Sequence, residues 1–200
     1  MGIILKKQKN ILQLSNKNGM IEIKETNMKK KRTTKKLVTL ALFVAMSLIM
    51  FLIESQFPPL FVPGAKMGLS NLFSLLALLW YGPVEAFAVI VARTLLGALF
   101  SNPFALVYSF TAGIATILLS AFLYRFVFPR ISVLAISVAG GVFHNLVQLV
   151  VYILFSETAL LVFYAPYLAL AGVLSGTIVG LTLLLIIKKI PLSVYRRILE

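Results

Sequence analysis

The sequence predicts an all-α integral membrane protein, a bundle of six transmembrane helices with both termini in the cytoplasm. The first reason is composition: of 200 residues, 60% are hydrophobic and only 12% are charged, whereas soluble domains carry about a quarter charged residues. The second is pattern, because the apolar residues form six continuous stretches rather than the alternation of barrel strands. The third is charge placement, since eleven of nineteen Lys and Arg residues precede Leu37.

The stretches divide the chain into three parts. Residues 1–36 are polar and basic and predict a largely disordered cytoplasmic tail, residues 37–190 the membrane domain, and residues 191–200 a short cytoplasmic tail. The six apolar stretches are Leu37–Ile53, Met67–Tyr81, Val84–Phe100, Phe104–Tyr124, Ile131–Phe155 and Leu160–Ile187. The second is short for a hydrocarbon core of about 30 Å, so we expect its outer end to be irregular and covered by protein. The sixth is long enough to tilt or to contain a turn near Pro166.

The basic residues set the orientation. With the N-terminus inside, the tails and the inner loop of Arg125 and Arg130 hold seventeen of the nineteen basic residues. The two others are Lys66, in an outer loop, and Arg93, within a stretch. This orientation obeys the positive-inside rule. Because the basic residues flank the apolar part rather than forming a face, the net charge of +13 favours anionic membrane lipids over nucleic acid as partner.

Several kinds of chemistry are excluded by residue type. The chain has no Cys, a single His and no Asp, so thiolate chemistry, disulfides and a His-built zinc site are ruled out. Diphosphate chemistry by prenyltransferases needs Asp-rich magnesium sites, which are missing. We therefore predict no catalytic residues, no metal, no cofactor and no enzymatic activity of the chain by itself.

Polar side chains at membrane depth are the candidate ligand-binding residues, because burying such groups in lipid is costly. His144 and Gln148 are four residues apart and share a helix face. They predict a polar cavity in the outer half that suits an anionic or strongly hydrogen-bonding ligand. The predicted set is Lys66, Asn71, Arg93, His144, Asn145 and Gln148. The alternative is a structural polar network, for example Arg93 paired with Glu54, and Lys66 as an interfacial lysine.

Small residues recur at helical spacing in two stretches. Ala41 and Ala45 lie on one face of the first, where they suit either internal helix packing or docking of a partner. Gly172, Gly176 and Gly180 repeat this spacing in the sixth stretch. For the glycines we favour close packing within the bundle.

Two segments resemble the motifs of a known family. Residues 63–72, PGAKMGLSNL, resemble the PGAKLGLAN signature of the Gx transporter family, which also carries the name heptaprenyl diphosphate synthase component I. Residues 141–149, GVFHNLVQL, resemble its GAxFHNxxQL motif. Shorter matches at residues 93–97 and 164–176 agree with its third and sixth helices, and the resemblance covers about residues 35–190.

That family is similar to the substrate-binding (S) components of energy-coupling factor (ECF) transporters, six-helix proteins with cytoplasmic ends. The resemblance implies that the loop from Glu54 to Lys66, with Pro63 and Gly64, forms a lid over an outward-facing site. It also implies that the two alanines of the first stretch dock a coupling subunit.

The function implied is the membrane-embedded S component of an ECF-type transporter for a small anionic amphipathic molecule related to flavins, quinones or prenyl compounds. Its partners would be a coupling subunit, two ATPases and the lipids of a bacterial cell membrane. The alternative is a non-catalytic membrane subunit of a polyprenyl diphosphate or quinone pathway, or of an extracellular electron transfer assembly.

Overall fold

A computed structural model describes residues 33–54, 68–100 and 103–189. The chain divides into two units, Met1–Thr39 with Glu200, and Leu40–Leu199. In the first unit only residues 33–39 are described, and they are helical. All regular structure in the described ranges is helical, with no strand among these residues, which confirms the predicted all-α class.

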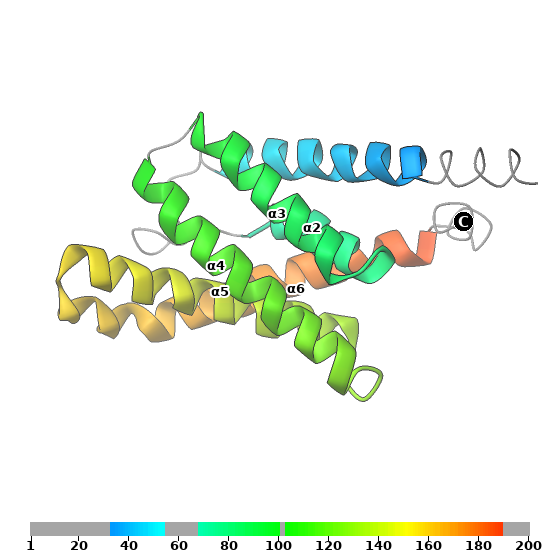
Figure 1. Ribbon diagram of the computed structural model, residues 1–200. Coiled ribbons are helices and arrows are strands. Elements are labelled where there is room, and N and C mark those ends of the chain that lie inside the picture. Colours follow the sequence, from blue (N-terminus) through cyan, green and yellow to red (C-terminus); the bar gives the residue numbers. More distant parts are fainter. Residues whose placement is uncertain (1–32, 55–67, 101–102, 190–200) are drawn as a thin grey trace, which may run out of the picture. The chain divides into compact units, whose positions relative to one another are not determined.

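In the described ranges, six α-helices, one short π-helix and one short 3-10 helix follow one another (Figure 1). The N-terminal helix is Thr33–Glu54. The later α-helices are α2 (Asn71–Trp80), α3 (Pro83–Ala98), α4 (Pro103–Phe122), α5 (Val133–Ser156) and α6 (Ala165–Lys189). A π-helix, η1 (Leu123–Val127), continues α4, and a 3-10 helix, η2 (Ala159–Tyr164), precedes α6. Each predicted apolar stretch therefore contains one α-helix.

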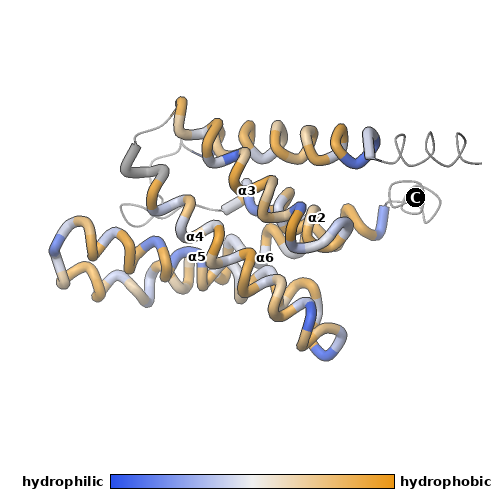
Figure 2. Tube along the Cα trace, in the orientation of Figure 1, coloured by the Kyte–Doolittle hydropathy of each residue, from blue (hydrophilic) through white to orange (hydrophobic). Residues whose placement is uncertain are grey.

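Four segments are long and apolar enough to cross a membrane: Thr33–Glu54, Val107–Val127, Val133–Ser156 and Ala159–Lys189. The other two helices are shorter, with ten residues in α2 and sixteen in α3. Apolar residues extend along most of α4, α5 and α6 (Figure 2), and many remain exposed. Leu118, Leu154 and Leu174, for example, are more than 60% exposed, as residues facing lipid would be. The chain is a helical multi-pass membrane protein.

The short helix α2 lies at the centre of the core. Leu76, Ala77 and Leu78 are at most 2% exposed, and α2 packs against α3, α4 and α6. Protein therefore surrounds the helix that is too short to span lipid squarely, which is the arrangement expected from its length. Phe43 of the N-terminal helix packs against this core through Phe73 and Trp80.

Backbone conformation explains two of the helix boundaries. Gly82 has a φ of 113°, which side chains rarely allow, and Pro83 follows as the first residue of α3. Ser132 accepts a hydrogen bond from the amide of Ala135 at 3.1 Å and caps α5. Pro166 lies in the first turn of α6, directly after η2, and the chain stays helical from Ala159 to Lys189. Near Pro166 the long sixth stretch therefore changes from 3-10 to α-helix rather than breaking at a turn.

Helices α5 and α6 are antiparallel neighbours whose backbones approach each other closely at several glycines (Figure 1). A Cβ atom on Gly141 would lie 2.5 Å from the carbonyl oxygen of Gly172, and one on Gly176 would lie 2.7 Å from that of Ser137. Glycine is therefore required at this crossing. The contacts confirm that the glycines of the sixth stretch serve packing within the bundle.

Candidate functional site

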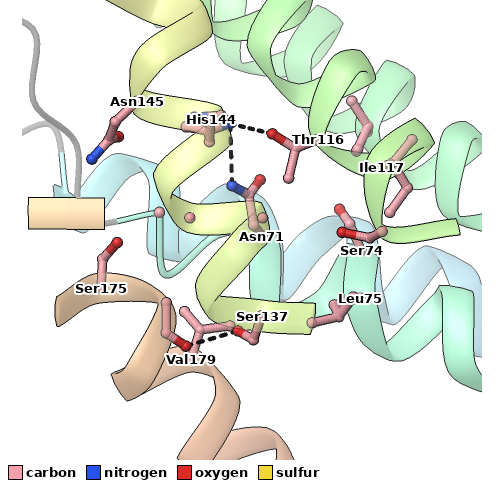
Figure 3. A pocket seen from close by; sticks show the side chains of 16 residues that line it. Asn71, Ser74, Leu75, Thr116, Ile117, Ser137, His144, Asn145, Ser175 and Val179 are labelled. Atoms are coloured by element: carbon pink, nitrogen blue, oxygen red, sulfur yellow. Dashed lines mark hydrogen bonds between the residues drawn. The ribbon is translucent and has the colours of Figure 1, made fainter. Parts of the chain in front are cut away.

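A cavity lies where α2, α3, α4, α5 and α6 meet (Figure 3). The volume not filled by atoms is about 490 Å³, which includes the open side of the cavity. Within it, the centre of a water-sized sphere can lie anywhere in about 30 Å³. Its polar lining residues are Asn71, Ser74, Thr116, Ser120, Ser137, His144, Asn145 and Ser175. Its apolar ones are Leu75, Ile90, Ile117 and Val179, with four glycines completing the wall.

His144 joins three helices at this cavity. Its Nδ1 lies 3.1 Å from Oγ1 of Thr116 on α4 and 3.5 Å from Nδ2 of Asn71 on α2 (Figure 3). The Thr116 hydroxyl also donates to the carbonyl of Ala112 at 2.6 Å.

Asn71 is positioned by the start of its own helix. Gly68 has a φ of 69°, and its carbonyl accepts the amide of Asn71 at 2.9 Å. This left-handed turn, which glycine adopts without strain, opens α2. The turn at the start of α2 therefore explains the glycine three residues before Asn71. This turn places the amide side chain of Asn71 at the cavity.

Arg93 belongs to a network beside the cavity. Its Nη1 donates to Oγ of Ser70, and its Nη2 donates to Oδ1 of Asn71 at 3.3 Å. Glu54 accepts from the amide of Leu69 and, at 3.5 Å, from the hydroxyl of Ser70. Ser70 thus links the guanidinium to the carboxylate.

Arg93 is 3% exposed and is absent from the cavity lining. It reaches the cavity through Asn71. The network agrees with the structural alternative for Arg93 and Glu54, and it places the positive charge next to the cavity rather than in it. Several hydrogen bonds to a buried charge offset part of the cost of removing that charge from water.

The two remaining predicted side chains of α5 differ in their partners. Asn145 is 1% exposed and donates to the carbonyl of Leu168 on α6 at 3.1 Å, so it ties the two helices together. In Figure 3 it extends away from His144 and Asn71. Gln148 is 5% exposed, lies outside the cavity lining, and its amide atoms have no hydrogen-bond partner in the described chain. The shared helix face of His144 and Gln148 therefore does not place both at the cavity.

The remaining predicted residues are split between the surface and the residues that are not described. Ala41 and Ala45 are exposed on the N-terminal helix. Lys66, Pro63 and Gly64 lie outside the described residues.

Sequence reasoning missed the hydroxyl groups of the cavity. Thr116 and Ser120 are four residues apart on α4, and Asn71 and Ser74 are three apart on α2. Ser74 lies about one helical turn from Asn71, a residue already predicted to bind ligand, and this spacing was the available signal. Ser and Thr give a weak signal because they often bond to their own helix backbone, as Ser175 does to Gly172 at 3.2 Å.

Among the described residues that line the cavity there is no Lys, Arg, Asp or Glu. In the described residues, no group of three or more His, Cys, Asp or Glu could hold a metal ion. What the lining offers is a set of neutral donors and acceptors against apolar walls. Such a set binds by hydrogen bonding and apolar contact.

The chain matches one protein-family model, described as heptaprenyl diphosphate synthase component I, over residues 43–186. No curated protein matches the chain with significant similarity. The match spans α2 to α5 and most of the N-terminal helix and α6, so it includes every described residue of the cavity. This helical, multi-pass membrane protein belongs to the heptaprenyl diphosphate synthase component I family.

Proposed function

We propose that the chain is the membrane-embedded substrate-binding component of an ECF-type transporter for a small amphipathic molecule. It would lie in a bacterial cell membrane with six spans and both termini in the cytoplasm. The ligand would bind in the cavity, and partner ATPases would supply the energy through a coupling subunit. The resemblance to S components and the family match support this proposal.

The observation that carries the proposal is the cavity itself. Polar residues that only tie helices together would leave no space between them. Here eight polar side chains line space that remains unfilled at the junction of five helices. In an apolar bundle, a pocket with convergent polar groups is the feature expected of a ligand site.

The exposed face of the N-terminal helix supports a docking role. Ala41 and Ala45 are exposed together with Val38, Leu42 and Ile49. Two small residues four apart allow a partner helix to approach closely. Because Ala41 and Ala45 are not needed inside the bundle, enlarging them changes the surface and leaves the described core intact.

Arg93 and His144 suit the polar end of the ligand in different ways. Through Asn71, Arg93 sets the position of an amide at the cavity, and its buried charge favours an acidic group placed nearby. His144 lines the cavity itself. An acidic group of the ligand would therefore lie on the Asn71 side, close to Arg93.

The test is a pull-down from native membranes in mild detergent. Wild type is compared with an Ala41→Leu, Ala45→Leu double variant, and partners are identified by mass spectrometry. We expect wild type to bring down a coupling protein and two ATPases and the double variant to lose them. A Leu118→Ala variant, changed at an exposed position of α4, is the control and should retain them. If wild type retains no ATPase, the transporter proposal is wrong.

The family name favours a second candidate, a non-catalytic membrane subunit of a polyprenyl diphosphate or quinone pathway or of an extracellular electron transfer assembly. This candidate predicts that the same pull-down recovers a soluble synthase or a redox protein. It also predicts that the recovery is unaffected by the double variant, since helix docking would not be the basis of association.

A further inference from the structure

The deep part of the cavity is uncharged and rich in hydroxyl groups. Ser74 and Ser120 both line it and are 1% and 2% exposed. Within the described chain the Ser74 hydroxyl has no hydrogen-bond partner. Ser137, in contrast, donates to the carbonyl of Gly176 at 2.8 Å. A buried hydroxyl without a partner is costly, so Ser74 offers a donor to whatever occupies the cavity.

These hydroxyls lie along the cavity away from Arg93. Asn71 is the first residue of α2, and Ser74 follows one turn later. Ser120 lies near the end of α4, and Ser137 lies near the start of α5, so the lining extends from the His144 level towards the α4–α5 turn. In the proposed orientation this is the cytoplasmic side. Arg93 therefore lies beside one end of the cavity, and the described lining of the other end consists of neutral groups.

The walls beside the hydroxyls are apolar. Leu75, Ile117 and Val179 line the cavity from three different helices. Apolar walls with a few neutral donors suit a ring that carries a hydrogen-bond acceptor. A carboxylate or phosphate in this part would meet no cation among the lining residues that the structure describes and would lose its hydration, which is strongly unfavourable.

We propose that this deep part binds the uncharged, carbonyl-bearing ring of the amphipathic ligand, with Ser74 as the principal donor and Ser120 as a second. The inference rests on the proposed function, which supplies the ligand, and it adds the chemical class of the buried portion. A carbonyl oxygen accepts from the hydroxyls while the ring packs against the three aliphatic side chains.

The experiment uses the full chain in lipid nanodiscs with three probes of one skeleton. These are indanone (a neutral cyclic ketone), indane (the same hydrocarbon without the carbonyl) and a carboxylate derivative of indanone. Binding is measured by equilibrium dialysis against empty nanodiscs, which corrects for partition into lipid. The infrared carbonyl band of bound indanone reports hydrogen bonding, because a hydrogen-bonded carbonyl absorbs at lower wavenumber than a free one.

The variants are Ser74→Ala, Ser120→Ala and the control Thr94→Val. Thr94 is 8% exposed and its hydroxyl also lacks a partner in the described chain, but it does not line the cavity. We expect saturable binding of indanone to wild type with a lowered carbonyl band. Each serine variant should lose roughly three- to tenfold in affinity, the range of one neutral hydrogen bond. The band should return towards its free position, and Thr94→Val should match wild type.

Three results would overturn the inference. If indane binds as tightly as indanone and the serine variants keep the wild-type affinity, binding depends on apolar contact alone. Preference for the carboxylate would show that the cavity selects charge. No saturable binding of indanone would show that the site does not take a neutral ketone.

Failure here is distinguishable from failure of the proposed function. The pull-down decides association with a coupling protein and ATPases whatever the probes do. If the ATPases are recovered but indanone does not bind, only the ligand class is wrong. If indanone binds as expected without any ATPase, the cavity assignment holds and the transporter role is wrong.

Discussion

Replacing Gly176 by Ala tests whether backbone contact between α5 and α6 holds the bundle together. An added Cβ would lie 2.7 Å from both the carbonyl oxygen of Ser137 and the Cα of Val138. Ordinary contacts begin at 3.4 Å, and the difference from 2.7 Å is 0.7 Å. Both neighbours are backbone atoms, so no side chain can rotate away. The helices must separate by about this distance.

The cost follows from that separation. Overpacking typically costs about 1–3 kcal/mol, and a contact with rigid backbone belongs at the upper end. Alanine gains about 1 kcal/mol in helix propensity over glycine. We therefore expect a net loss of roughly 2 kcal/mol in the free energy of unfolding. The hydrogen bond from Ser137 to the Gly176 carbonyl should weaken as well, since it crosses the same interface.

The assay is unfolding in mixed micelles as the fraction of denaturing detergent increases. Gly113→Ala is the matched control on α4, because its Cβ would meet a side-chain atom rather than backbone, Cγ2 of Ile90 at 3.2 Å, which has to shift by only a few tenths of an ångström. The control should be as stable as wild type or more stable. If Gly176→Ala also unfolds at the wild-type midpoint, backbone contact does not hold α5 against α6, and the reasoning from the glycines is refuted.

Four further variants test the polar groups. In the same unfolding assay, Ser137→Ala should lower the free energy of unfolding by about 0.6–1.7 kcal/mol, because it removes the hydrogen bond to Gly176. Ser74→Ala should leave the free energy of unfolding unchanged without ligand, because the Ser74 hydroxyl has no described partner. Asn145→Ala should cost about 0.5–1.5 kcal/mol in the free energy of unfolding, because it removes a buried hydrogen bond between α5 and α6; a wild-type midpoint would exclude the tie between helices. Arg93→Ala should abolish ligand binding in a monodisperse, folded sample, because Asn71 loses its donor; unchanged affinity in dialysis would contradict that role.

Hydropathy predicted the helices well because lipid imposes a simple rule on each of them. Every spanning segment must satisfy its own backbone and present apolar side chains, so a continuous apolar stretch predicts a helix. The close contact of the α6 glycines with α5 could be predicted from their spacing for a similarly local reason. Spacing along one helix could not show which partner lies opposite, and this is why Gln148 was grouped with His144 although only His144 lines the cavity.

The hydrogen-bond partners of the polar residues could be identified only from the tertiary structure. Arg93 meets Ser70 and Asn71 across more than twenty positions of sequence, and His144 meets Thr116 across twenty-eight. Serine and threonine gave no selective signal, because in a helix their hydroxyls can bond to the backbone four residues earlier. Only the packing shows that several of them surround one cavity.

The sequence by itself determined the class of protein, the approximate positions of the helices, and the small set of polar residues in apolar surroundings. These depend on local properties: transfer of side chains into lipid, backbone hydrogen bonding, and the conformations open to Gly and Pro. The tertiary structure alone decided that Arg93 stands beside the cavity, that Asn145 ties α5 to α6, and that hydroxyls line the deep end. Those outcomes depend on how helices rotate and cross, and close packing sets this between residues far apart in the chain.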